Sequence, residues 1–86
     1  MVVPYSVIVT RPAQSAVDLL APMQAQCVFV ALRALAANPR PSGCIKLTNS
    51  DEWRIRVGDY RVIYEINDTE LLVTVIAVGH RCDVYR

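Results

Sequence analysis

A predicted β-hairpin at residues 53–64 constrains the fold of this chain more than any other feature. Before the turn, apolar and basic residues alternate in the order Trp53, Arg54, Ile55, Arg56 and Val57. A period of two is typical of a strand with one apolar face and one polar face. The dipeptide Gly58-Asp59 suits a two-residue hairpin loop, after which residues 60–66 predict the returning strand. The hairpin therefore places the two arginines that precede the turn on one face of a sheet.

The N-terminal half of the chain predicts one strand followed by two helices. Residues 5–9 are rich in β-branched residues, which favour a strand. Thr10 is a candidate N-cap, and a proline stands at the start of each expected helix, residues 13–20 and residues 23–37. The second helix carries a single charge, on Arg33, so one broad face of it must be buried.

Together these segments predict one domain, residues 1–86, of the α+β class. Residues 44–47 suit a short extended segment, and residues 71–78 suit a last, mostly buried strand. We expect a small sheet of about four mainly antiparallel strands in the order β-α-α-β-β-β, with the two N-terminal helices packed on one face. A chain of 86 residues leaves no room for a second domain.

Composition argues against several classes of protein. The chain is 53% apolar with a mean hydropathy of +0.29, which argues against disorder and indicates apolar surface meant for a partner. The longest apolar stretch is too short to span a bilayer, so we expect no membrane partner. Cys27, Cys44 and Cys82 lack a CxxC spacing, which argues against a structural zinc site or a disulfide framework. Reduced cysteines and an N-terminus without signal-peptide features favour a cytoplasmic protein.

The charge balance is nearly neutral, but the placement of arginine is uneven. Nine basic residues against eight acidic residues give a net charge of +1, and Lys46 is the one lysine among them. Five of the arginines follow the start of the hairpin: Arg54, Arg56, Arg61, Arg81 and Arg86. Guanidinium groups in fixed positions bind phosphates well. The arginines therefore suggest RNA chemistry, although the overall charge does not require a nucleic-acid partner.

Arg54 and Arg56 leave the same face two residues apart. Two like charges at this spacing repel and would gain from an anion between them. The alternative is a solvated outer face whose charge is balanced by Asp51, Glu52 and Glu65.

Arg61 follows the turn directly. In the hairpin it should lie near Val57 or Arg56 of the partner strand. The alternative role for this arginine is an ion pair with Asp59 or Glu65.

The C-terminal residues add an imidazole and a phenol. His80, the one histidine, is able to titrate near neutral pH, and the alternative is a structural or exposed histidine. Arg81 is placed to pair with Asp83, and Tyr85 is placed to stack on a base or to have no role. We expect guanidinium, imidazole and phenol groups on one face of the sheet, although an ideal strand points His80 and Arg81 to opposite faces.

The C-terminal part of the chain resembles the RelE/ParE superfamily of bacterial and archaeal toxins. The matching stretches are WRIRVGDYRVIYE at residues 53–65, VIAVGHR at residues 75–81 and DVY at residues 83–85. The upstream strand and helical pair are similar to the family in order and length. The resemblance therefore covers nearly the whole chain and implies a RelE-like fold.

Members that resemble RelE cut messenger RNA in the ribosomal A site without a metal or other cofactor. The ribose 2′-hydroxyl attacks the adjacent phosphate in that reaction. The resemblance implies a catalytic set composed of Arg54, Arg56, Arg61, Arg81 and Tyr85. His80 is a candidate base because arginine stays protonated. The same arginines and Tyr85, together with Arg86, are the expected RNA-binding residues.

The resemblance also implies partners and alternatives. The expected partners are a cognate RelB-like antitoxin, the ribosome and messenger RNA, with promoter DNA contacted only through the antitoxin. One alternative is a ParE-like inhibitor of DNA gyrase without nuclease activity, which the low net charge favours. The other is a catalytically degenerate, antitoxin-bound regulator, because some members carry lysines where this chain has Arg54 and Arg56.

Overall fold

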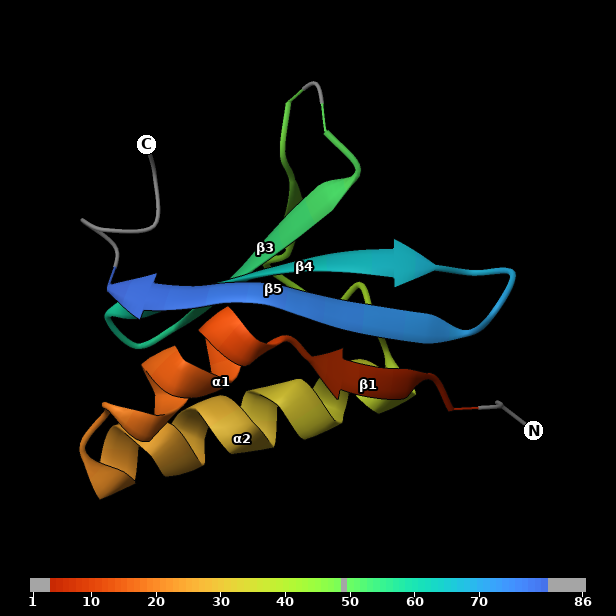
Figure 1. The fold of residues 1–86 in the computed structure, drawn as a ribbon. Helices are drawn as coiled ribbons and strands as arrows, with labels where there is room; N and C mark the ends of the chain where they lie inside the picture. The colour runs from red at the N-terminus through yellow and green to blue at the C-terminus, as the bar shows by residue number, and fades with distance from the viewer. Residues whose placement is uncertain (1–3, 49, 81–86) are drawn as a thin grey trace.

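The computed structural model describes residues 4–48 and 50–80 (Figure 1). Its elements, in chain order, are β1 (Ser6–Val9), α1 (Arg11–Asp18), α2 (Pro22–Ala37), β2 (Ile45–Lys46), β3 (Glu52–Val57), β4 (Tyr60–Asn67) and β5 (Leu72–His80). The predicted α+β class and the predicted order of elements are confirmed. Within the described residues the sheet has five strands instead of about four, because the short extended segment before the hairpin pairs with β3 as β2.

The sheet is mixed, with the strand order β1-β5-β4-β3-β2. β1 lies parallel to β5, and the remaining neighbours are antiparallel. Figure 1 shows α1 and α2 together on one side of the sheet, as predicted. The opposite side is called the open face below, because no helix of the described residues covers it.

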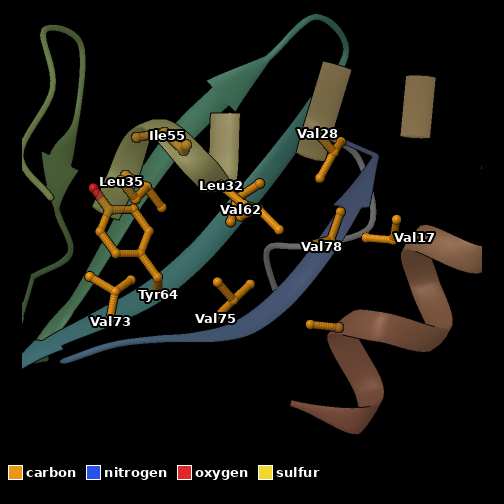
Figure 2. Packing of buried hydrophobic residues seen from close by; sticks show 11 residues of the cluster. Val17, Val28, Leu32, Leu35, Ile55, Val62, Tyr64, Val73, Val75 and Val78 are labelled. Carbon is orange, nitrogen blue, oxygen red and sulfur yellow. The ribbon is translucent and has the colours of Figure 1, made fainter. Parts of the chain in front are cut away.

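The hydrophobic core lies between the two helices and the sheet (Figure 2). Its buried members are Ala13, Val17, Val28, Leu32, Leu35, Ile55, Val62, Tyr64, Val73, Val75 and Val78. Tyr64 is the largest of the fully buried side chains, and its hydroxyl donates a hydrogen bond of 2.7 Å to the carbonyl oxygen of Pro39. Burial raises the pKa of the Tyr64 phenol. The Tyr64 hydroxyl therefore stays protonated, and its hydrogen bond to Pro39 satisfies a polar group that would otherwise be unpaired inside the core.

The buried stripe of α2 is narrower than the sequence predicts. Of its apolar residues, Met23 is 80% exposed, Val30 is 60% exposed and Phe29 is 46% exposed. The helix is apolar around most of its circumference, so its sequence does not reveal which side faces the sheet.

An irregularity in the sheet lies between β4 and β5. Ile63 pairs with Ala77, and Tyr64 pairs with Val75, so Ile76 has no partner in this register. This is a β-bulge, an extra residue in one strand that shifts the alternation of side chains by one position. The sequence predicts a regular last strand over residues 71–78 and does not reveal the bulge.

A charged cluster joins three distant parts of the chain. Arg40 donates hydrogen bonds of 3.2 and 2.9 Å to the two carboxylate oxygens of Asp68. The hydroxyl of Tyr5 donates to the same carboxylate at 2.6 Å, and the Arg40 guanidinium lies 5.1 Å from the centre of the Trp53 ring. The cluster thereby ties the residues before β1 and after α2 to the turn between β4 and β5.

Because of this cluster, we expect part of the free energy of unfolding to be lost at low pH. The hydrogen bonds from Arg40 and Tyr5 hold the pKa of the Asp68 carboxyl below its ordinary value. Such a group stabilises the fold fully above its unfolded pKa, about 3.9, and loses that contribution as the pH falls through the lower folded pKa. We expect the unfolding free energy of Asp68→Asn, measured by urea denaturation from about pH 5 to about pH 2, to fall less steeply than that of the wild type. Asp51→Asn is the matched control at an exposed aspartate, and equal slopes for the wild type and Asp68→Asn would contradict the prediction.

Candidate functional site

The β3–β4 hairpin brings three arginines to the open face. Arg56 and Arg61 are direct cross-strand partners, and Arg54 pairs with Ile63. Partners in an antiparallel pair project from the same face, so all three arginine side chains share it. Gly79 of β5 is the next partner of Arg61. The predicted position of Arg61 beside Arg56 is confirmed, and these arginines together are called the arginine face below.

The charges of the arginine face favour an anion. Arg56 lies directly opposite Arg61, and like charges in this arrangement destabilise a strand pair. Arg56 is exposed, and its Nε donates a hydrogen bond of 3.1 Å to the carbonyl oxygen of Gly58, which draws the guanidinium toward the turn. Arg54 and Arg61 are partly buried. Guanidinium groups gathered on one face are suited to charge-assisted hydrogen bonds with a phosphate.

Of the acidic residues that the sequence suggests as counter-charges, Asp59 lies in the turn itself, whereas Glu52 and Glu65 lie at the other end of the hairpin. Glu52 and Glu65 are direct partners of each other on β3 and β4. Arg56 makes no salt bridge with an acidic residue of the described segments. Among the described residues of the hairpin, the open face therefore carries arginines near the turn and glutamates at the other end.

His80 lies on the other side of the sheet from the arginine face. It pairs with Tyr60, which pairs with Val57, and the rings of Tyr60 and His80 meet edge to face with centroids 5.8 Å apart. The expectation that the imidazole shares a face with the guanidinium groups is therefore wrong for the three arginines of the hairpin. The cause is the bulge at Ile76, because a regular strand continuing from Val75 would point His80 to the open face.

A pocket of about 540 Å³ lies beside His80 on the helix side of the sheet. Its lining residues are Met23, Gln24, Cys27, Val57, Gly58, Asp59, Tyr60 and His80. Gly58 contributes to this pocket and also accepts the hydrogen bond from Arg56. Sequence reasoning missed the contribution of α2 to this pocket, because no local pattern connects residues so far apart in the chain.

Other expected site residues lie outside the described residues. These are Arg81, Tyr85 and Arg86, and their positions relative to Arg61 stay predictions. Within the described segments, no group of three or more histidine, cysteine, aspartate or glutamate side chains is arranged to hold a metal ion. None of the helices in those segments has the length and apolar character needed to cross a membrane.

A comparison with protein families gives a match over nearly the whole chain. The family described as ParE toxin of type II toxin-antitoxin system, parDE, matches residues 7–85. No curated protein matches the chain.

Solved structures of toxin–antitoxin complexes have the same fold. A chain of the complex RelBE2 from Mycobacterium tuberculosis is 28% identical, with a TM-score of 0.84, and the match covers 96% of this chain and 98% of that one. A chain of the RelE–RelB complex from Pyrococcus horikoshii is 25% identical, with a TM-score of 0.84, covering 94% of this chain and 99% of that one. The YoeB/ParE toxin from Agrobacterium tumefaciens is 13% identical, with a TM-score of 0.77 and coverage of 88% and 98%. At this identity the last likeness concerns the fold alone.

Proposed function

The chain belongs to the ParE toxin family of type II toxin–antitoxin systems, and from that premise we propose that it is a ribosome-dependent endoribonuclease that cuts messenger RNA in the A site. The observation that carries this proposal is the arginine face. Arg56 and Arg61 stand directly opposite each other, with Arg54 on the same face, and no helix of residues 4–48 and 50–80 covers that face (Figure 1). An RNA phosphate is the anion that this arrangement fits best.

The proposed reaction needs alignment and charge stabilisation. The ribose 2′-oxygen attacks the adjacent phosphorus, the bond from phosphorus to the 5′-oxygen breaks, and a 2′,3′-cyclic phosphate and a 5′-hydroxyl result. Negative charge grows on the phosphoryl oxygens, where fixed guanidinium groups stabilise it. Holding the three reacting atoms in line contributes through orientation. Arg61 is assigned to the scissile phosphate because it lies on β4, which has a strand on either side, and is partly buried opposite Arg56.

The remaining roles rest on sequence position. Arg81 is assigned to the leaving 5′-oxygen, Tyr85 to stacking on a neighbouring base, and Arg86 to the RNA backbone. His80 keeps its role as candidate base only if its imidazole reaches the RNA around the end of β5. Its contact with Tyr60 on the helix side favours catalysis by electrostatic stabilisation over proton transfer by this histidine.

The proposed partners are a RelB-like antitoxin, the ribosome and messenger RNA. The similar structures from Mycobacterium tuberculosis and Pyrococcus horikoshii are toxin–antitoxin complexes, which supports the antitoxin. Met23, Phe29 and Val30 leave apolar surface exposed on α2, as a chain that binds a partner requires. Promoter DNA would be contacted through the antitoxin, and a ribosomal target places the chain in the cytoplasm.

Inhibition of DNA gyrase is the second candidate function. The matching family is described by its ParE toxin, and a net charge of +1 provides little long-range attraction to the ribosome. In this alternative the arginine face binds a protein partner and cuts no RNA. A catalytically degenerate regulator would retain antitoxin binding and have neither activity.

Incubation with programmed ribosomes carrying a defined messenger tests the proposal. The messenger ends are mapped by primer extension, with a ribosome-free reaction as the control. We expect cuts at the A-site codon that disappear without ribosomes. A folded protein that arrests growth but produces no cuts would contradict the proposal and direct the next assay to gyrase supercoiling. The absence of both cuts and growth arrest would favour the degenerate regulator.

A further inference from the structure

Thr10 uses its side chain in an unexpected way. The sequence predicts an N-cap for α1, but the Thr10 hydroxyl makes no capping hydrogen bond with that helix. Its Oγ1 instead lies 2.8 Å from the carbonyl oxygen of Val75 and 3.2 Å from that of Ile76, so its one proton is shared between two acceptors. The backbone N–H of Thr10 also donates to Val75, at 3.1 Å.

The start of α1 explains why this hydroxyl is available. Pro12 occupies the first turn of the helix and has no backbone N–H. One of the donors that an N-cap oxygen ordinarily accepts from is therefore missing. The carbonyl oxygen of Thr10 still accepts the first helical hydrogen bond, from Gln14 at 2.9 Å. The helix begins normally while the hydroxyl bonds to β5.

The two carbonyl groups that Thr10 contacts belong to the bulge. Val75 is the last paired residue before it, and Ile76 is the residue without a partner. Because the bulge shifts the alternation, Ala77 and Gly79 point to the open face, and Val78 and His80 point to the helices. A regular ladder beyond Val75 would reverse all four positions and would place an imidazole beside the arginines.

We propose that Thr10 is a positioning residue for the arginine face, and that it acts by holding the bulge of β5. In the held register Arg61 is opposite Gly79, which has no side chain. Without the bulge, Val78 would take the place of Gly79 opposite Arg61 and would add a branched side chain to the arginine face. The proposal rests on the proposed function only for the identity of that ligand, RNA.

Burial supports the same register independently. Val78 is only 6% exposed and lies in the core near Val17 of α1 (Figure 2). A regular ladder would move Val78 to the open face and replace it in the core with Ala77. Without the Thr10 hydroxyl, we therefore expect β5 to exchange between the bulged and the regular pairing with β4, while the chain stays folded.

The matched pair Thr10→Val and Thr10→Ser tests the proposal. Valine keeps the branched shape and removes the hydroxyl, whereas serine keeps the hydroxyl. In the NMR spectrum of Thr10→Val, we expect the cross-strand contacts between Arg61 and Gly79 and between Tyr60 and His80 to weaken or broaden by exchange. Ribosome-dependent cleavage should fall at least about tenfold, since small misplacements in a catalytic site have effects of this size. Thr10→Ser should keep both the cross-strand contacts and the cleavage rate near those of the wild type.

Deletion of Ile76 provides a second, independent variant. The deletion creates a regular ladder in which Ala77 still pairs with Ile63, so every later residue keeps its face. In the deletion background, Thr10→Val should therefore have little further effect on these contacts. If Thr10→Val alone does not fold, the double variant still tests whether the hydroxyl acts through the bulge.

Two results would overturn the proposal. In the first, Thr10→Val keeps the cross-strand contacts of the wild type. In the second, Thr10→Val weakens these contacts equally in the wild-type background and in the Ile76 deletion. A wild-type protein that binds its antitoxin but cuts no RNA would overturn the proposed function alone. The NMR comparison would then still decide the role of Thr10.

Discussion

Arg61→Ala is expected to reduce the rate of A-site cleavage by about a hundredfold or more, the usual effect of removing one fixed group that stabilises transition-state charge. Arg61 is partly buried and lies opposite Arg56 on one side and Gly79 on the other. A guanidinium held there contributes without reorganising during the reaction. Single-turnover cleavage on programmed ribosomes measures the effect.

The matched control for this experiment is Arg11→Ala. It removes the same charge from an exposed position on α1, away from the arginine face, so it reports the loss of general attraction to the ribosome. Arg61→Lys keeps the charge but loses the planar fork, and its rate should fall between those of the wild type and the alanine variant. Equal rates for Arg61→Ala and Arg11→Ala would show that Arg61 does not contact the reacting phosphate. Circular dichroism and antitoxin binding should be unchanged in all three variants.

The part of the site that is local in sequence could be predicted. The hairpin follows from alternation and from a turn in which Gly58 has φ +60°, a conformation that suits glycine. Since cross-strand partners in a two-residue hairpin are fixed by the turn, the pairing of Arg56 with Arg61 follows from the residues between them. The shared face of the arginines is therefore a consequence of a dozen adjacent residues.

The parts of the site that depend on distant contacts could not be predicted. The bulge at Ile76 has no sequence signal in β5, and its hydrogen-bond partner, Thr10, lies in another part of the chain. The face of His80 depends on that bulge, so the predicted face of His80 was wrong, whereas the predicted shared face of Arg54 and Arg56 is confirmed. The parallel pairing of β1 with β5 is likewise set by how the helices return the chain to the sheet.

The sheet that carries the arginine face is stabilised by packing against α2. Among substitutions on that helix, Leu35→Ala should lower the free energy of unfolding the most. Leu35 is fully buried and packs in the core close to Tyr64 (Figure 2). Deleting a buried leucine side chain typically lowers the free energy of unfolding by about 3 kcal/mol, because transfer energy is lost and a cavity remains. A domain of this size has about 4–13 kcal/mol in total. The variant should therefore lose a large share of its stability and more than about 10 °C in Tm.

Val30→Ala is the matched control on the same helix. Val30 is 60% exposed, so its truncation should change the free energy of unfolding by no more than about 0.5 kcal/mol. Urea denaturation followed by circular dichroism compares the two midpoints directly. Since alanine is the better helix former in both variants, a loss confined to Leu35→Ala comes from packing against the sheet and not from helix propensity. Equal midpoints would mean that α2 does not dock on the sheet through this residue, and the arginine face would then lack the support that holds its guanidinium groups in place.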